Sequence, residues 1–149
     1  MTPLDLTLEP PRSARETILG FYLLARTIDK LRAELPGGKL GAYLNDDTGF
    51  SAFVIRRLGL DMNDVRRAVA QAASEADVIE WLAARIDPHI APVLNAKLET
   101  FVVERMSAPD QILVRERHPV MAVRPDLSKM LDILDADDRV TFPQSVRQR

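Results

Sequence analysis

The chain has 149 residues and a formal net charge of −2; 46% of its residues are hydrophobic and 28% are charged. This composition is typical of a soluble globular protein and gives no general attraction to nucleic acid or an anionic membrane. The absence of cysteine excludes disulfides, thiolate metal ligands and cysteine nucleophiles. No segment resembles a signal peptide or approaches the roughly 18 apolar residues of a membrane span. We therefore expect one cytoplasmic domain that is not associated with a membrane.

The first third of the sequence predicts a long helix between two irregular segments. Residues 1–12 carry three prolines and are expected to form an extended lead-in. Ser13 and Glu16 have the spacing of a capping box, and apolar residues then recur at helical spacing as far as Leu35. The glycines after Pro36 favour the end of this helix and an irregular loop over residues 36–47.

Three further helices are predicted by their caps. Asp47 or Thr48 is expected to cap a short second helix that stops at Gly59. Asp61 is the predicted N-cap of a third helix, and Ser74 that of a fourth. No hairpin signal or internal repeat interrupts this pattern.

The last third of the sequence is also mainly helical in this interpretation. Asp87-Pro88 predicts a fifth helix that begins either at residue 88 with an irregular first turn or at residue 92. Ser107 is expected to cap a sixth helix, and residues 120–123 to form a brief extended segment. A last helix is predicted over residues 127–134, and a loose tail over 139–149. The predicted fold is all-α, a single-domain bundle of about six helices over residues 1–149.

Two charged residues lie among the apolar residues of the first predicted helix. Arg32 falls within its apolar arc and Asp29 at its border, whereas Lys30 and Glu34 are placed on the opposite, solvated side. A buried Asp29 should be paired, most simply with Arg32 or Arg26. The pair either anchors the neighbouring loop, which we favour, or lines a pocket for a small anion or polar ligand.

Other candidate sites carry weaker signals. His89 and His118 lack metal-ligand spacing, and the acidic cluster Asp135, Asp137 and Asp138 is expected to be a solvated, partly frayed helix end rather than a metal site. The second and third predicted helices resemble a helix–turn–helix motif. Arg66 and Arg67 would lie on the third predicted helix, which is the second helix of that motif. Acidic residues at the start of that helix would repel DNA.

Several motifs together resemble a bacterial family of unknown function, the domain-of-unknown-function family numbered 5069. They are RSARETILGFYLLARTIDKLRAEL, LGAYL, RRLGLD and ADVIEWL, and the resemblance is close over roughly residues 11 to 85. It implies that the matched motif positions include Arg26, Asp29, Lys30, Arg32 and Tyr43. Members of the family tend to carry other polar residues where this chain has Asn45 to Thr48.

The sequence favours a non-catalytic binding or interaction module for a protein partner or a small polar ligand. The candidate ligand-binding residues are Arg26, Asp29, Arg32 and Tyr43, and a homo-oligomer is left open. No catalytic residue, metal or cofactor is assigned, and nucleic acid is an unlikely partner. One alternative is an enzyme or metal-binding protein whose site lies near Asp29 and loop 37–47, with Arg26 and Tyr43 beside Asp29 and with the 135–138 cluster. A third interpretation is a helix–turn–helix DNA binder.

Overall fold

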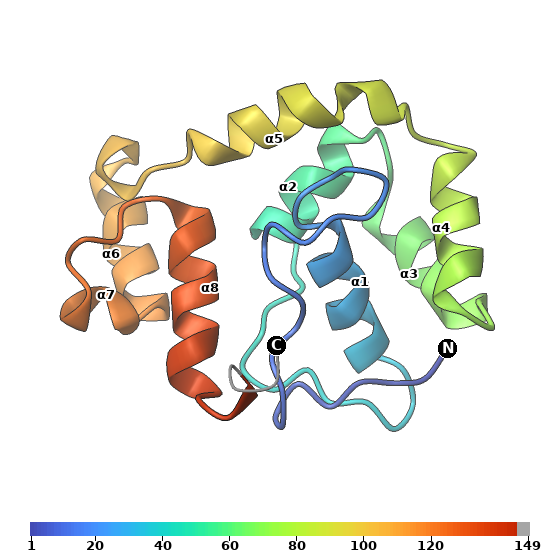
Figure 1. Ribbon diagram of the computed structural model, residues 1–149, viewed down its shortest axis with the longest axis horizontal. Helices are drawn as coiled ribbons and strands as arrows, with labels where there is room; N and C mark the ends of the chain where they lie inside the picture. Colours follow the sequence, from blue (N-terminus) through green and yellow to red (C-terminus); the bar gives the residue numbers. More distant parts are fainter. Residues whose placement is uncertain (146–149) are drawn as a thin grey trace. The chain divides into compact units, whose positions relative to one another are not determined.

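The computed structural model describes residues 1–145 and confirms the all-α fold (Figure 1). That part of the chain contains eight α-helices, two short 3₁₀ helices and no β-strand, so the helices are slightly more numerous than expected. By its contacts the chain divides into two compact units, Met1–Leu94 and Asn95–Arg149. The first unit holds the residues that the sequence singles out on its first helix.

The first unit is built around helix α1 (Leu24–Ala33), which contacts both α2 (Phe50–Arg57) and α3 (Met62–Gln71). Helix α4 (Glu75–Ala83) packs on α3, and a 3₁₀ helix (Pro88–Ile90) follows it. Apolar side chains from these helices and from the segment before α1 form the core. Its fully buried members include Phe21, Leu24, Ile28, Leu31, Ile55, Val65, Val69 and Leu82.

The predicted caps of α3 and α4 are confirmed. The Asp61 side chain accepts hydrogen bonds from the first backbone amides of α3, and Ser74 forms a reciprocal capping box with Asp77 at the start of α4. Gly59 directly follows Leu58, the C-cap of α2, and has a φ of 73°, a conformation that favours glycine. The cap expected for α2 was wrong, because Gly49 occupies its N-cap without a side-chain hydrogen bond.

The first helix is shorter than the sequence predicts. It begins at Leu24, and residues 13–23 form turns and irregular backbone in place of the roughly three helical turns expected there. Leu19, Gly20 and Leu23 have φ values of 51°, 83° and 65°, which interrupt a right-handed helix. The apolar side chains of Ile18 and Leu23 are nevertheless buried. The helical spacing therefore reported burial correctly, but a folded turn buries these side chains without a helix.

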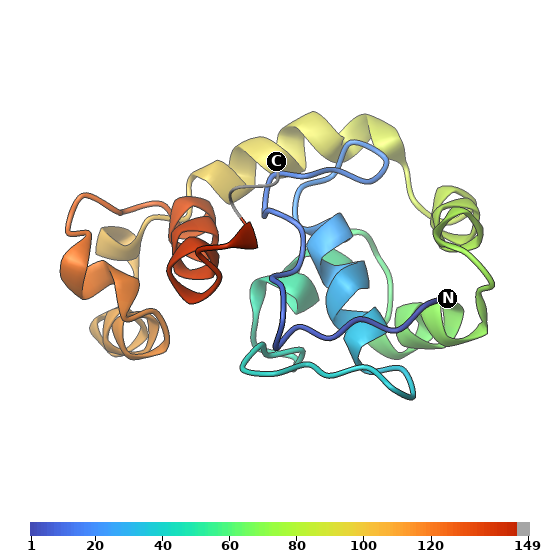
Figure 2. The ribbon, with the colours of Figure 1, turned by 60° about the horizontal axis from the view of Figure 1, so that its bottom comes forward.

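The lead-in is fixed against the loop that follows α1. Leu6 donates a backbone hydrogen bond of 2.8 Å to Lys39, and the amide of Lys39 donates one of 2.9 Å to Leu4. Figures 1 and 2 both show these two segments side by side. Gly38 is required at the entry to the loop, since a Cβ atom there would lie 2.6 Å from the carbonyl oxygen of Ala33.

The second unit contains the remaining helices. Helix α5 (Ala91–Glu99) includes the boundary between the units and follows the irregular 88–90 turn, as expected from Pro92. A 3₁₀ helix (Val103–Arg105) precedes α6 (Ala108–Arg117), whose N-cap is the predicted Ser107. Helix α7 (Val120–Val123) packs against α8 (Met130–Thr141).

Two predicted elements of the second unit differ from those in the structure. Residues 120–123 form the helical turn α7, because Pro119 enters it with helical geometry and Val120 and Met121 are both buried, a pattern that does not alternate. Helix α8 starts at Met130 and not at residue 127, because residues 128–130 form backbone hydrogen bonds with residues 101–103. It continues to Thr141. Of the tail expected over residues 139–149, residues 146–149 lie outside the described residues.

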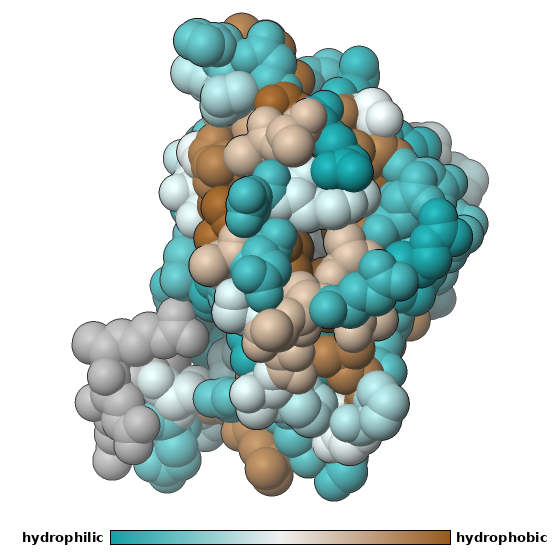
Figure 3. All heavy atoms as spheres, turned by 90° about the vertical axis from the view of Figure 1, so that its right-hand side faces the viewer, coloured by the Kyte–Doolittle hydropathy of each residue, from teal (hydrophilic) through white to brown (hydrophobic). Residues whose placement is uncertain are grey.

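Hydrophilic and apolar residues are interspersed on the face that carries α4 (Figure 3). Among the described residues, the longest helix has 12 residues, and none is both long and apolar enough to cross a membrane.

Candidate functional site

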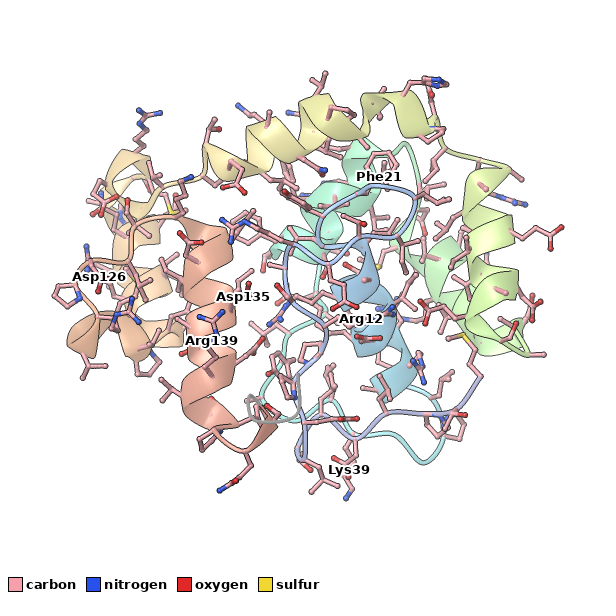
Figure 4. All side chains as sticks on the ribbon, in the orientation of Figure 1. Arg12, Phe21, Lys39, Asp126, Asp135 and Arg139 are labelled. Carbon is pink, nitrogen blue, oxygen red and sulfur yellow. The ribbon has the colours of Figure 1, made fainter. Side chains whose placement is uncertain are left out.

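Asp29 is buried on α1 and is bound mainly by Arg12, a residue of the lead-in. One carboxylate oxygen, Oδ2, accepts from both the backbone amide and Nε of Arg12 at 2.9 Å, and Oδ1 accepts from Nη2 at 2.8 Å. Figure 4 labels Arg12 where it lies against α1. Of the expected partners, Arg32 forms a longer ion pair of 3.8 Å with Asp29, and Arg26 donates to the backbone oxygen of Arg12.

A second carboxylate completes this cluster. Arg12 Nη1 donates to Glu75 Oε1 at 2.8 Å, and Glu75 stands at the first position of α4, immediately after the Ser74 cap. Arg32 lies 4.0 Å from Glu75 and uses its Nε to donate to the backbone oxygen of Thr2 at 3.0 Å. The cluster of Arg12, Asp29, Arg32 and Glu75 therefore joins the lead-in to α1 and α4.

The charges in this cluster satisfy one another. Burial acts to lower the pKa of Arg12, but its hydrogen bonds to Asp29 and Glu75 outweigh burial and raise that pKa above the ordinary value. Both oxygens of Asp29 accept hydrogen bonds from Arg12 in a paired, forked arrangement. Asp29 and Arg32 therefore both bind residues of the lead-in, Asp29 through Arg12 and Arg32 through the backbone oxygen of Thr2.

Arg26 and Tyr43 meet on another side of α1. The guanidinium carbon of Arg26 lies 5.4 Å from the centroid of the Tyr43 ring, within the range of a cation–π contact. Arg26 itself is buried, with 4% of its surface exposed. This contact joins α1 to the loop that the sequence motif LGAYL had singled out.

Lys30 is the main residue whose environment was predicted wrongly. It is not on a solvated face: only 8% of its surface is exposed, and Nζ donates to the backbone oxygen of Leu44 at 2.8 Å. Burial, and then the charge of Arg26, lower the pKa of Lys30 to about 7, against the weaker attraction of Asp46 and Glu34. The sequence contained a signal for this position, since Lys30 stands four residues after Arg26 and so leaves α1 on the same side.

The next residue at this spacing, Glu34, also contacts the loop. Its Oε1 accepts from Asn45 Nδ2 at 2.8 Å, and its Oε2 accepts from Arg66 of α3 at 2.7 Å. Loop residues 43–45 therefore lie along one side of α1, where they contact residues 26, 30 and 34 in turn. Arg67, the other arginine of the predicted recognition helix, pairs with Asp64.

The second unit holds the other sequence-predicted groups. Asp137 and Asp138 lie within α8, short of its end, so the frayed acidic terminus was wrong: Asp137 Oδ2 is 2.9 Å from His118 Nδ1, and Asp138 is buried. Figure 4 shows Asp135 on the same helix. His89 is exposed beside Asp87 at the 88–90 turn. In residues 1–145, histidines and carboxylates form no group of three or more that could hold a metal ion.

These features define an all-α protein with two buried cations on one helix, covered by a loop. The chain belongs to the family described as a domain of unknown function, DUF5069, whose model matches residues 8–140. This result confirms the resemblance seen in the sequence. A comparison with curated proteins gives no significant match. The description of the family assigns no activity.

Proposed function

We propose that this protein is a binding module for a small anionic ligand, which it holds at the cation stripe formed by Arg26 and Lys30 on α1. The observation that carries the proposal is the environment of Lys30. A buried ammonium group is normally paired with a carboxylate, yet among the described residues Lys30 has one backbone oxygen as its hydrogen-bond acceptor. Arg26, one helical turn earlier on α1, is a second cation.

The balance of charge around α1 supports this proposal. Asp29 and Glu75 are already occupied by Arg12, with Arg32 close to both. Glu34 is bound by Asn45 and Arg66. A small anion beside Lys30 would place a carboxylate next to its buried ammonium group, and one of the ligand's oxygens would accept a further hydrogen bond from Lys30.

The proposal is tested by the thermal stability of the protein with and without sodium acetate, at constant ionic strength adjusted with sodium chloride. At pH 6.5 acetate should raise the melting temperature of the wild type, since a ligand that binds only the folded state stabilises it. Lys30→Met should abolish that rise. Lys97→Met, which removes an exposed lysine from α5, should leave it unchanged.

The outcome is decided by the comparison of the two lysine variants. An equal response of the wild type and Lys30→Met would show that acetate acts elsewhere and would overturn the proposed site. The absence of any response in the wild type at high acetate concentration would also count against it.

A further inference from the structure

The side-chain oxygen of Asn45 is buried and has no hydrogen-bond partner within the described part of the chain. Its orientation is fixed by Nδ2, which donates to Glu34; a carboxylate can only accept, so the nitrogen and not the oxygen must face Glu34. Buried polar atoms are almost always satisfied. Asn45 Oδ1 is therefore an acceptor without a donor.

A donor with spare capacity, Lys30 of α1, is hydrogen-bonded to the adjacent loop residue. Lys30 Nζ bonds to the carbonyl of Leu44, the residue directly before Asn45. An ammonium group has three N–H donors, and the described structure gives Lys30 one acceptor. Leu44 is held by Lys30 of α1 and Asn45 by Glu34, the C-cap residue of α1; the two are about one helical turn apart.

We propose that the ligand of the cation stripe is a small 2-hydroxy carboxylate, with its carboxylate on Lys30 and Arg26 and its hydroxyl group donating to Asn45 Oδ1. This inference rests on the proposed function and adds the chemical class of the ligand. A simple carboxylate such as acetate supplies the negative charge, but it has no donor for Asn45. A hydroxyl on the carbon next to the carboxylate supplies that donor at short range.

Glycolate and acetate are the matched probes, because they differ by one hydroxyl group. Each is titrated into the ¹⁵N-labelled protein at pH 6.5 and constant ionic strength, and the dissociation constant is taken from the amide chemical shifts. The wild type should bind glycolate on the order of tenfold or more tightly than acetate, because a site that hydrogen-bonds a hydroxyl discriminates against its absence.

A variant of Asn45 tests whether this residue is the source of the preference. Asn45→Ala should show equal dissociation constants for the two ligands. Asn95→Ala, a control in the second unit, should keep the full preference for glycolate. A preference that persists in Asn45→Ala would assign the hydroxyl to another group and would overturn the inference.

The wild-type titrations alone separate this inference from the proposed function. Equal affinity for glycolate and acetate would refute the hydroxy acid assignment and leave anion binding at Lys30 intact. If neither ligand binds, the proposed function itself fails. Because this comparison needs no variant, an Asn45→Ala protein that does not fold would not prevent a decision.

Discussion

Arg12 donates three hydrogen bonds to the Asp29 carboxylate, one from its backbone amide and two from its guanidinium group. The two residues are 17 positions apart, and their contact fixes the lead-in to the buried side of α1. The guanidinium group of Arg12 also binds Glu75, so Arg12 joins α1 to the start of α4. The unexpected charges of the first helix thus belong to a structural junction.

Removing Arg12 should be more damaging than removing Arg32. Arg12→Met leaves the buried Asp29 without its main partner, and loss of one member of a buried pair costs about 3–5 kcal/mol. Arg32→Met should cost less than half as much, because Arg32 is 3.8 Å from Asp29. Urea denaturation of both variants measures the free energies of unfolding. Equal losses would show that the two arginines share Asp29 evenly.

Arg12 should be coupled more strongly to Asp29 than to Glu75. Glu75 is the more exposed partner, with 30% of its side chain accessible against 5% for Asp29, and exposed ion pairs contribute about 0.2–1 kcal/mol. Double-mutant cycles of Arg12→Met with Asp29→Asn and with Glu75→Gln measure the two coupling energies. A larger coupling to Glu75 would contradict this order.

Lys30→Met should stabilise the protein at and below neutral pH. The folded-state pKa of Lys30 is about 7, below the ordinary lysine value of 10.5, so the charged form is disfavoured by folding. That penalty is fully present below pH 7 and is lost as the pH rises towards the unfolded value. Between pH 7 and pH 8 the wild type should therefore gain about 1 kcal/mol of stability relative to Lys30→Met.

The measurement is urea denaturation of the wild type and Lys30→Met at several pH values from 6 to 9. Their difference removes the contributions of the other titrating groups, which the two proteins share. A difference that is independent of pH over this range would mean that Lys30 titrates as an ordinary exposed lysine.

Two glycine substitutions test the entry to the loop that covers the cation stripe. Gly38→Ala places a Cβ atom 2.6 Å from a backbone oxygen, whereas a Cβ at Gly49 meets nothing within 4 Å and the φ there is −89°. We expect Gly38→Ala to destabilise by more than about 2 kcal/mol and Gly49→Ala to change stability by less than about 1 kcal/mol. Thermal denaturation measures the melting temperatures of the two variants. Similar values would argue against the described geometry of the loop.

The local signals in the sequence were reliable where one side chain determines the outcome. The caps at Asp61, Ser74 and Ser107 were predicted correctly, because each needs only a side-chain oxygen near the first free amides of a helix. The start of α1 was missed because helical spacing reports which side chains are buried, and the turns at Leu19 and Leu23 bury the same residues.

The partners across the chain could not be predicted in the same way. Arg12 was missed because its contact with Asp29 depends on the path of the lead-in, which no periodic pattern describes. Lys30 was misplaced because a helical wheel assigns the solvated side from α1 alone, whereas the loop at residues 43–45 covers that side. Charged residues on a short helix are therefore placed correctly only once the loops around it are known.

The most direct test of the central claim is the pKa of Lys30 itself, measured by NMR from the ¹³Cε and ¹⁵Nζ shifts, with Lys30→Met to assign the signal. We predict a pKa near 7 in the free protein, from the burial of its amine beside Arg26. Saturation with glycolate should raise it, because a bound anion favours the charged form. An ordinary pKa near 10.4 in the free protein, or a value that does not change with glycolate, would contradict the account.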